Sequence, residues 1–167
     1  MNRIRPVLIL FLTASIGGCI AEEGPLGTSG GSVGTFSITI PEFANGPTNG
    51  KATFQLERVE NVSTLTVSFL DSLGFSTLIS GPGAPVVGDD REIGEAEGLI
   101  GGILVRQGTS GVETYVLTAG TLSIDGVSAT RLVGTIEFTA VQRDGPAIGS
   151  TIHGSGNFTA SGGNSET

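Results

Sequence analysis

The chain has 167 residues, a formal net charge of −8 at pH 7 and 28 glycines, but only one cysteine, one histidine and one tyrosine, and no tryptophan. The acidic balance argues against nucleic acid as a partner, and the scarcity of aromatic side chains disfavours stacking platforms for sugars or bases. A single cysteine excludes an internal disulfide, and a single histidine excludes zinc sites built from several histidines.

The first 18 residues have the layout of a secretory signal peptide. Arg3 and Arg5 form a basic start, residues 7–12 form an apolar run, and small residues precede Cys19. The apolar run is much shorter than the roughly 20 residues that span a bilayer. We therefore expect a signal over residues 1–18, whose removal changes the net charge from −8 to −10 because both arginines leave with it.

Ile16, Gly17, Gly18 and Cys19 together resemble the lipobox of bacterial lipoproteins. The resemblance implies that Cys19 receives a diacylglyceryl group, that the signal is removed before it, and that lipid anchors the protein in the bacterial cell envelope. Ile20 stands where an aspartate would favour retention in the inner membrane, so the resemblance implies the outer membrane. A thioether to lipid also accounts for the lone thiol, and several acyl chains give lasting attachment.

Residues 19–33 are expected to be the lipidated cysteine and a flexible Gly/Ser-rich tether with a reach of roughly 20 Å. Residues 30–34 (GGSVG) have the letters of a G-x-S-x-G nucleophile elbow, but no strand precedes the serine and no helix follows it, so we interpret them as linker. About 130 residues remain, which suits one domain. We place it at residues 34–160, followed by a disordered tail at 161–167.

Apolar and polar residues alternate along much of this domain, as in half-buried β-strands, and no segment shows convincing helical periodicity. The expected strands lie at residues 34–40, 52–58, 63–70, 114–118, 120–126, 132–140 and 150–160. Gly154 and Gly156 fall on the inward parity of the last strand, which predicts a bulge or a close approach of the backbone. The pattern predicts an all-β protein with a single antiparallel β-sandwich; an open or closed β-barrel is the alternative.

Residues 120–124 (GTLSI) and 131–140 (RLVGTIEFTA) resemble the C-terminal strands of uncharacterised β-rich bacterial lipoproteins. In that pattern, Ile136 and Glu137 stand where phenylalanine and serine are usual. The resemblance implies a β-rich fold and assigns no mechanism.

The densest group of ionisable side chains lies at residues 89–97 and contains five carboxylates and one arginine. The carboxylates belong to Asp89, Asp90, Glu92, Glu95 and Glu97. Oxygen-rich loops can hold Ca²⁺, although the order of residues here differs from that of an EF-hand. Two interpretations follow, a weak calcium site and a solvated acidic loop, and no other cofactor is expected.

His153 falls on the polar parity of its strand, and we interpret it as a solvated residue. Glycoside hydrolysis needs two carboxylates that face each other, and the sequence spacing pairs none of the available acids. These acids are Glu57, Glu60, Asp71, Glu113, Glu137 and Asp144. We therefore expect a lipid-anchored, non-catalytic envelope protein that binds or supports an unknown envelope protein or ligand. The alternative is an envelope hydrolase that uses paired carboxylates.

Overall fold

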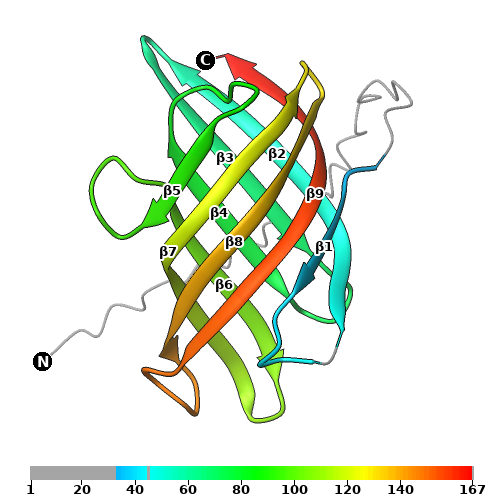
Figure 1. Ribbon diagram of the computed structural model, residues 1–167, viewed down its shortest axis with the longest axis vertical. Coiled ribbons are helices and arrows are strands. Elements are labelled where there is room, and N and C mark those ends of the chain that lie inside the picture. Colours follow the sequence, from blue (N-terminus) through cyan, green and yellow to red (C-terminus); the bar gives the residue numbers. More distant parts are fainter. Residues whose placement is uncertain (1–32, 45, 167) are drawn as a thin grey trace, which may run out of the picture.

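The computed structural model describes residues 33–44 and 46–166, which form nine β-strands in one sheet and no helix (Figure 1). The strands are β1 (Thr35–Thr39), β2 (Pro47–Val59), β3 (Val62–Leu70), β4 (Ser76–Pro82), β5 (Asp90–Gly94), β6 (Gly101–Gly108), β7 (Gly111–Val127), β8 (Arg131–Asp144) and β9 (Thr151–Glu166). The predicted all-β class is confirmed.

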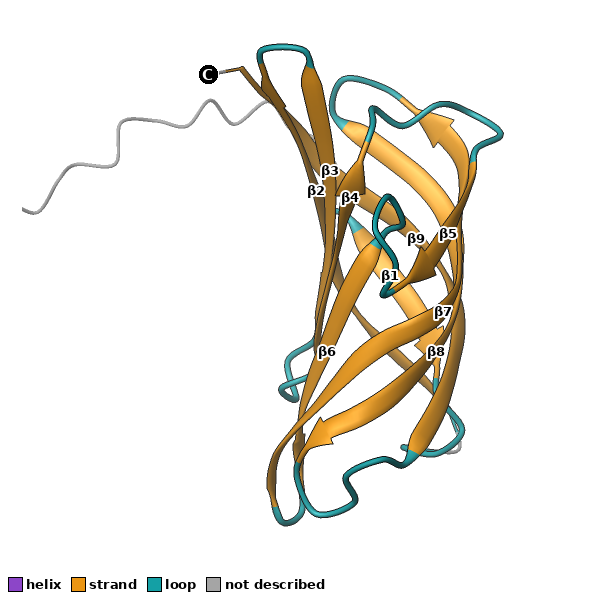
Figure 2. Cartoon of the chain, turned by 90° about the vertical axis from the view of Figure 1, so that its left-hand side faces the viewer, coloured by secondary structure: helices purple, strands orange, loops and turns teal. Residues whose placement is uncertain are grey.

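The sheet closes on itself and forms an eight-stranded barrel. The strand order is β7-β6-β4-β3-β2-β1-β9-β8, and β8 pairs back with β7. The short strand β5 pairs with the second half of β7, beyond the part that pairs with β6. Figures 1 and 2 show the tilted strands wrapping around a single interior. The predicted sandwich is therefore wrong, and the closed barrel that was its alternative is confirmed.

The long strand β7 explains why one sheet forms instead of two. The two strands expected between residues 114 and 126 are one strand of 17 residues, and it has a bulge just after Leu117. The bulge changes the parity, so Tyr115 and Leu117 are buried before it and Leu122 and Ile124 after it. Bulges bend a strand and increase its twist. A bent β7 can therefore stay paired with β8 along its length while the sheet curls.

β1 is inserted between β2 and β9. It pairs antiparallel with residues 47–51 of β2 and residues 155–159 of β9. Beyond the start of β1, residues 53–58 of β2 pair directly with residues 161–166 of β9 in a parallel arrangement. Gly34 lies at this fork, where a Cβ atom would collide with backbone atoms of both neighbouring strands.

The end of the chain and the middle of the domain contain strands that the sequence did not predict. Residues 161–166, expected in a disordered tail, extend β9 because their backbone pairs with β2, which would otherwise present an unpaired edge. Strands β4, β5 and β6 form in segments rich in turn residues and acids, where no strand was expected. Pairing with β7 outweighs the weak strand propensity of the acidic β5 segment, whereas β4 and β6 each have a short apolar or β-branched run, at residues 77–79 and 103–105, flanked by turn residues.

The interior is filled by the apolar side chains that the alternation places inward. The predicted inward residues that are buried in the structure are Phe36, Ile38, Ile40, Phe54, Leu56, Leu65, Val67, Phe69, Tyr115, Leu117, Leu122, Ile124, Ile136, Phe138, Ala140, Ile152 and Phe158. The predicted inward and outward parity of these segments is therefore confirmed.

Large and small residues face each other across neighbouring strands of this core. Phe138 on β8 lies opposite Gly154 on β9 and Gly120 on β7. Phe158 on β9 lies opposite Gly134 on β8. The rings of Phe138 and Phe158 lie over Gly154 and Gly134, and they fit there only because glycine has no side chain. This arrangement keeps the core close-packed without collisions. The close approach predicted at Gly154 is confirmed.

This packing predicts that Gly154→Ala destabilises the fold. A Cβ atom at Gly154 would collide with the ring of Phe138, which is only 2% exposed and cannot easily move. Overpacking of this kind costs about 1–3 kcal/mol in the free energy of unfolding. The control is Gly101→Ala on the outer face of β6, where the nearest atom lies 3.9 Å from the added Cβ. Urea unfolding measures both variants, and equal stability of the two would contradict the proposed packing.

Candidate functional site

The predicted acidic loop is in part a strand. Residues 90–94 form β5, whose alternation leaves Asp90 and Glu92 exposed and buries Ile93. The side chain of Asp90 accepts a hydrogen bond of 2.6 Å from the hydroxyl of Ser123 on β7. Two of the five predicted calcium ligands therefore lie on the outer face of the barrel, and one of them already has a protein donor.

The other three predicted ligands point to different partners. Asp89 forms an ion pair with Arg91 at 3.1 Å, Glu95 forms one with Arg143 at 3.0 Å, and Glu97 is exposed. Within the part of the chain that the structure describes, no group of three or more His, Cys, Asp or Glu side chains could hold a metal ion. A calcium site at residues 89–97 thus stays a prediction, and these side chains do not form a ligand shell in advance.

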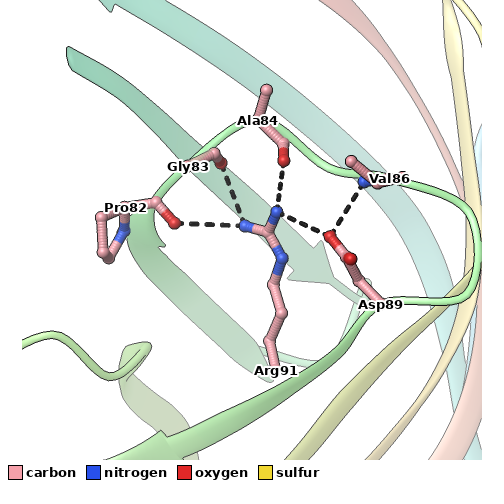
Figure 3. A network of polar contacts seen from close by, with 6 residues as sticks. All are labelled: Pro82, Gly83, Ala84, Val86, Asp89 and Arg91. Carbon is pink, nitrogen blue, oxygen red and sulfur yellow. Dashed lines mark hydrogen bonds and ion pairs between the residues drawn. The ribbon is translucent and has the colours of Figure 1, made fainter.

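Arg91 joins β5 to the segment after β4, to which no strand pairing connects it (Figure 3). Its Nη1 donates to the carbonyl oxygens of Pro82 and Gly83 at 3.3 and 3.0 Å, and its Nη2 donates to the carbonyl oxygen of Ala84 and to Oδ2 of Asp89. The planar guanidinium presents several donors in a fixed geometry, which suits this set of acceptors. The Arg91 side chain thus connects β5 to the end of β4, two segments that have no backbone strand pairing with each other.

Asp89 contributes to this network of hydrogen bonds around Arg91, which we name the Arg91 network, from the loop side. Its Oδ2 also accepts a hydrogen bond of 3.0 Å from the backbone N–H of Val86. The hydrogen bond from Arg91, followed by that from Val86, holds the pKa of Asp89 below its ordinary value. Asp89 is therefore ionised at neutral pH and serves as a structural partner of Arg91.

A polar groove of about 760 Å³ crosses the outer face of β5, β7, β8, β9 and the end of β1. One row of paired positions runs along it, in the order Glu92, Thr121, Glu137, Ser155 and Thr39. With Asp90, three carboxylates line the groove, and its lining contains neither lysine nor arginine. The groove therefore attracts cationic or hydroxyl-bearing groups.

His153 stands at the edge of this groove and is exposed, as predicted. Its Nδ1 lies 3.0 Å from Oε1 of Glu42, and its backbone N–H donates to the same oxygen at 3.1 Å. The hydrogen bond with the His153 side chain holds the pKa of Glu42 below its ordinary value. Glu42 follows β1, 111 residues away in the sequence, so only the pairing of β1 with β9 brings the two residues together.

A second polar cluster lies beside Phe43, the residue that follows Glu42. Nε of Arg106 and the hydroxyl of Tyr115 both donate to Oε2 of Glu113, at 2.6 and 2.9 Å. The Arg106 guanidinium also lies 3.7 Å from the centre of the Phe43 ring, a cation–π contact. Glu113 was one of the acids considered for hydrolysis, and the structure buries it in this ion pair. Its cross-strand position opposite Arg106, next to the glycines of a hairpin, is a signal that the sequence contained.

The predicted signal peptide, the predicted lipobox at residues 16–19 with Cys19, and the predicted tether up to residue 32 lie outside the described residues. In the described ranges, no helix is long and apolar enough to cross a membrane.

Comparisons with known proteins give no relative for this chain, because no family model, curated protein or solved structure matches it. Its residues and their geometry are therefore the basis for a functional proposal.

The hydrogen bonds of the Arg91 network predict that Arg91→Lys destabilises the fold although the charge is kept. An ammonium cannot reproduce the fork that reaches three carbonyl oxygens and Asp89, and the loss of hydrogen bonds to a charged group costs roughly 1.5–3 kcal/mol. The matched control is Arg143→Lys, whose exposed pair with Glu95 contributes at most about 1 kcal/mol. Urea unfolding, with amide exchange at residues 83–94, checks this, and equal losses in both variants would disprove a special role for Arg91.

The buried pair predicts a pH-dependent contribution from Glu113. The hydrogen bond from Arg106 lowers the pKa of Glu113, burial opposes this, and the hydrogen bond from Tyr115 lowers it further. The ionised carboxylate therefore stabilises the fold above its ordinary pKa, and this contribution is lost as the pH falls from about 4.3 towards the lower folded value. We expect Glu113→Gln to cost about 1–3 kcal/mol at pH 7 and less in acid, because glutamine keeps an acceptor oxygen but lacks the charge that pairs with Arg106. Denaturant unfolding from pH 7 to 3 measures this, and a cost that does not change with pH would contradict it.

Proposed function

We propose that this protein is a lipid-anchored component of the bacterial cell envelope, attached to the outer membrane, and that its barrel has a non-catalytic binding or structural role. The observation that carries the proposal is the ordered series of basic start, apolar run, small residues and Cys19, followed by a Gly/Ser-rich segment. The lipid on Cys19 is the proposed contact with the membrane.

The barrel supports a role for the outer surface. Its interior is filled by aliphatic and aromatic side chains, so a ligand is more readily accommodated on the outside. The polar groove with Asp90, Glu92 and Glu137 is the outer feature best suited to a partner, and its charge fits a cationic or hydroxyl-rich segment of an envelope protein or ligand. Affinity capture of the full lipidated chain from native envelopes would identify that partner.

One observation favours the alternative, an envelope hydrolase. Glu92 on β5 and Glu137 on β8 occupy the same row of the groove, and Thr121 on β7 lies between them. Two strand spacings separate their backbones by about 10 Å, which is close to the carboxyl separation of roughly 6.5–9.5 Å in inverting glycosidases. Hydrolysis that is lost in Glu92→Gln and in Glu137→Gln would favour the enzyme over the binding protein.

The lipid anchor predicts that Cys19→Ser abolishes acylation. Without the thiol no thioether can form, so the variant should remain as an uncleaved precursor or be released from the membrane. The full chain is expressed in a bacterial host with radioactive palmitate, and Ser32→Ala in the tether serves as the control that keeps its label. Palmitate labelling of Cys19→Ser at the level of the wild type would refute the anchor.

A further inference from the structure

One outer face of the barrel carries no charged residue. It consists of the outward positions of β3, β4, β6 and the first half of β7, strands that lie side by side (Figure 2). We name it the uncharged face, and its residues are Thr64, Thr66, Ser68, Leu70, Ser76, Leu78, Ser80, Pro82, Gly101, Ile103, Val105, Gln107, Val112, Thr114, Val116 and Thr118. In contrast, the outward positions of β2, β5, β8 and β9 include Lys51, Glu57, Asp90, Glu92, Arg131, Glu137, Arg143 and His153.

Apolar side chains form the centre of the uncharged face. Leu78, Ile103 and Val116 are paired across β4, β6 and β7, and Leu78 and Ile103 are 49% and 48% exposed. Leu99, in the segment between β5 and β6, joins these three side chains around a mainly apolar groove of about 450 Å³, which Glu95 also lines. Glu95 forms an exposed ion pair with Arg143 on β8. Scattered apolar residues on a surface are ordinary, but an apolar centre whose one neighbouring carboxylate is paired with an arginine has the composition of an interface core with a polar rim.

We propose that the uncharged face is the contact between two copies of this chain. The distribution of charge favours this occupant over a different partner. Each copy carries a net charge of −8, or −10 without the signal, and two copies repel each other if their acidic grooves meet. Contact through the uncharged face leaves Glu92 on β5 and Glu137 on β8 outside the contact, because neither strand belongs to that face. A basic partner would be drawn to the acidic groove instead.

The size and shape of the face also fit a two-fold pair. A face four strands wide and about seven residues long, with the neighbouring Leu99 segment, corresponds to roughly 1,000 Å² buried in total, which is near the lower limit for a specific interface. Two such faces can pack as sheets do, with side chains interdigitating, and the same patch serves both copies around a two-fold axis. An interface of this size predicts a dimer that depends on concentration.

The first test measures the mass of the full chain by sedimentation equilibrium in density-matched detergent over a range of concentrations. The wild type should change from monomer to dimer as its concentration rises. Ile103→Glu, which places a charge at the centre of the face, should weaken the association at least tenfold. Thr135→Glu adds the same charge on the exposed outer side of β8 and should leave the association unchanged. A wild type that stays monomeric, or equal association of both variants, would overturn the proposal.

The second test detects the contact in intact cells and does not depend on an added charge. Ile103→Cys in the full chain is treated with a short bismaleimide in intact cells, with the wild type in parallel to account for Cys19 and Thr135→Cys as the control on the exposed outer side of β8. A product of twice the chain mass, formed only by Ile103→Cys, supports the two-copy contact. No product overturns it, and so does a product with a different protein, because the face then belongs to another partner.

Discussion

The structure depends on the closure of a single sheet. β9 pairs with β8 on one side and with both β1 and β2 on the other, so its 16 residues join the first two strands of the chain to β8 and close the sheet. β1 fills the fork between β2 and β9, and Arg91 joins β5 to the end of β4 where strand pairing stops. Without these contacts the sheet would have open edges, which are sites for aberrant pairing.

Closure fixes the volume of the interior and therefore decides which residues pack in the core and which stay exposed on the outer surface. The inward positions must fill a narrow space, which is why Phe138 faces Gly154. The interior is then occupied by the core, and the outer positions remain for partners. They divide into an acidic groove around Glu92 and Glu137 and the uncharged face around Ile103, which gives the barrel two chemically distinct sides.

The sequence predicts the inward residues well, because alternation in a strand depends only on the strand itself. It does not distinguish a sandwich from a barrel, since both bury the same face of each strand. The difference lies in long-range pairing such as that of residues 53–58 with 161–166, for which no local signal exists. The acidic segment was interpreted as a loop because charges disfavour strands, yet pairing with β7 makes it β5. The contact of Glu42 with His153 also depends on distant strands.

The central claim is that β9 closes the barrel on β2, and solution NMR tests it most directly. We expect nuclear Overhauser effects between backbone protons of residues 53–58 and residues 161–166, together with slow exchange of the amides that join these two strands. If residues 161–166 exchange rapidly and show no such effects to β2, while β9 keeps its contacts with β8, the sheet is open at this seam and the account is contradicted.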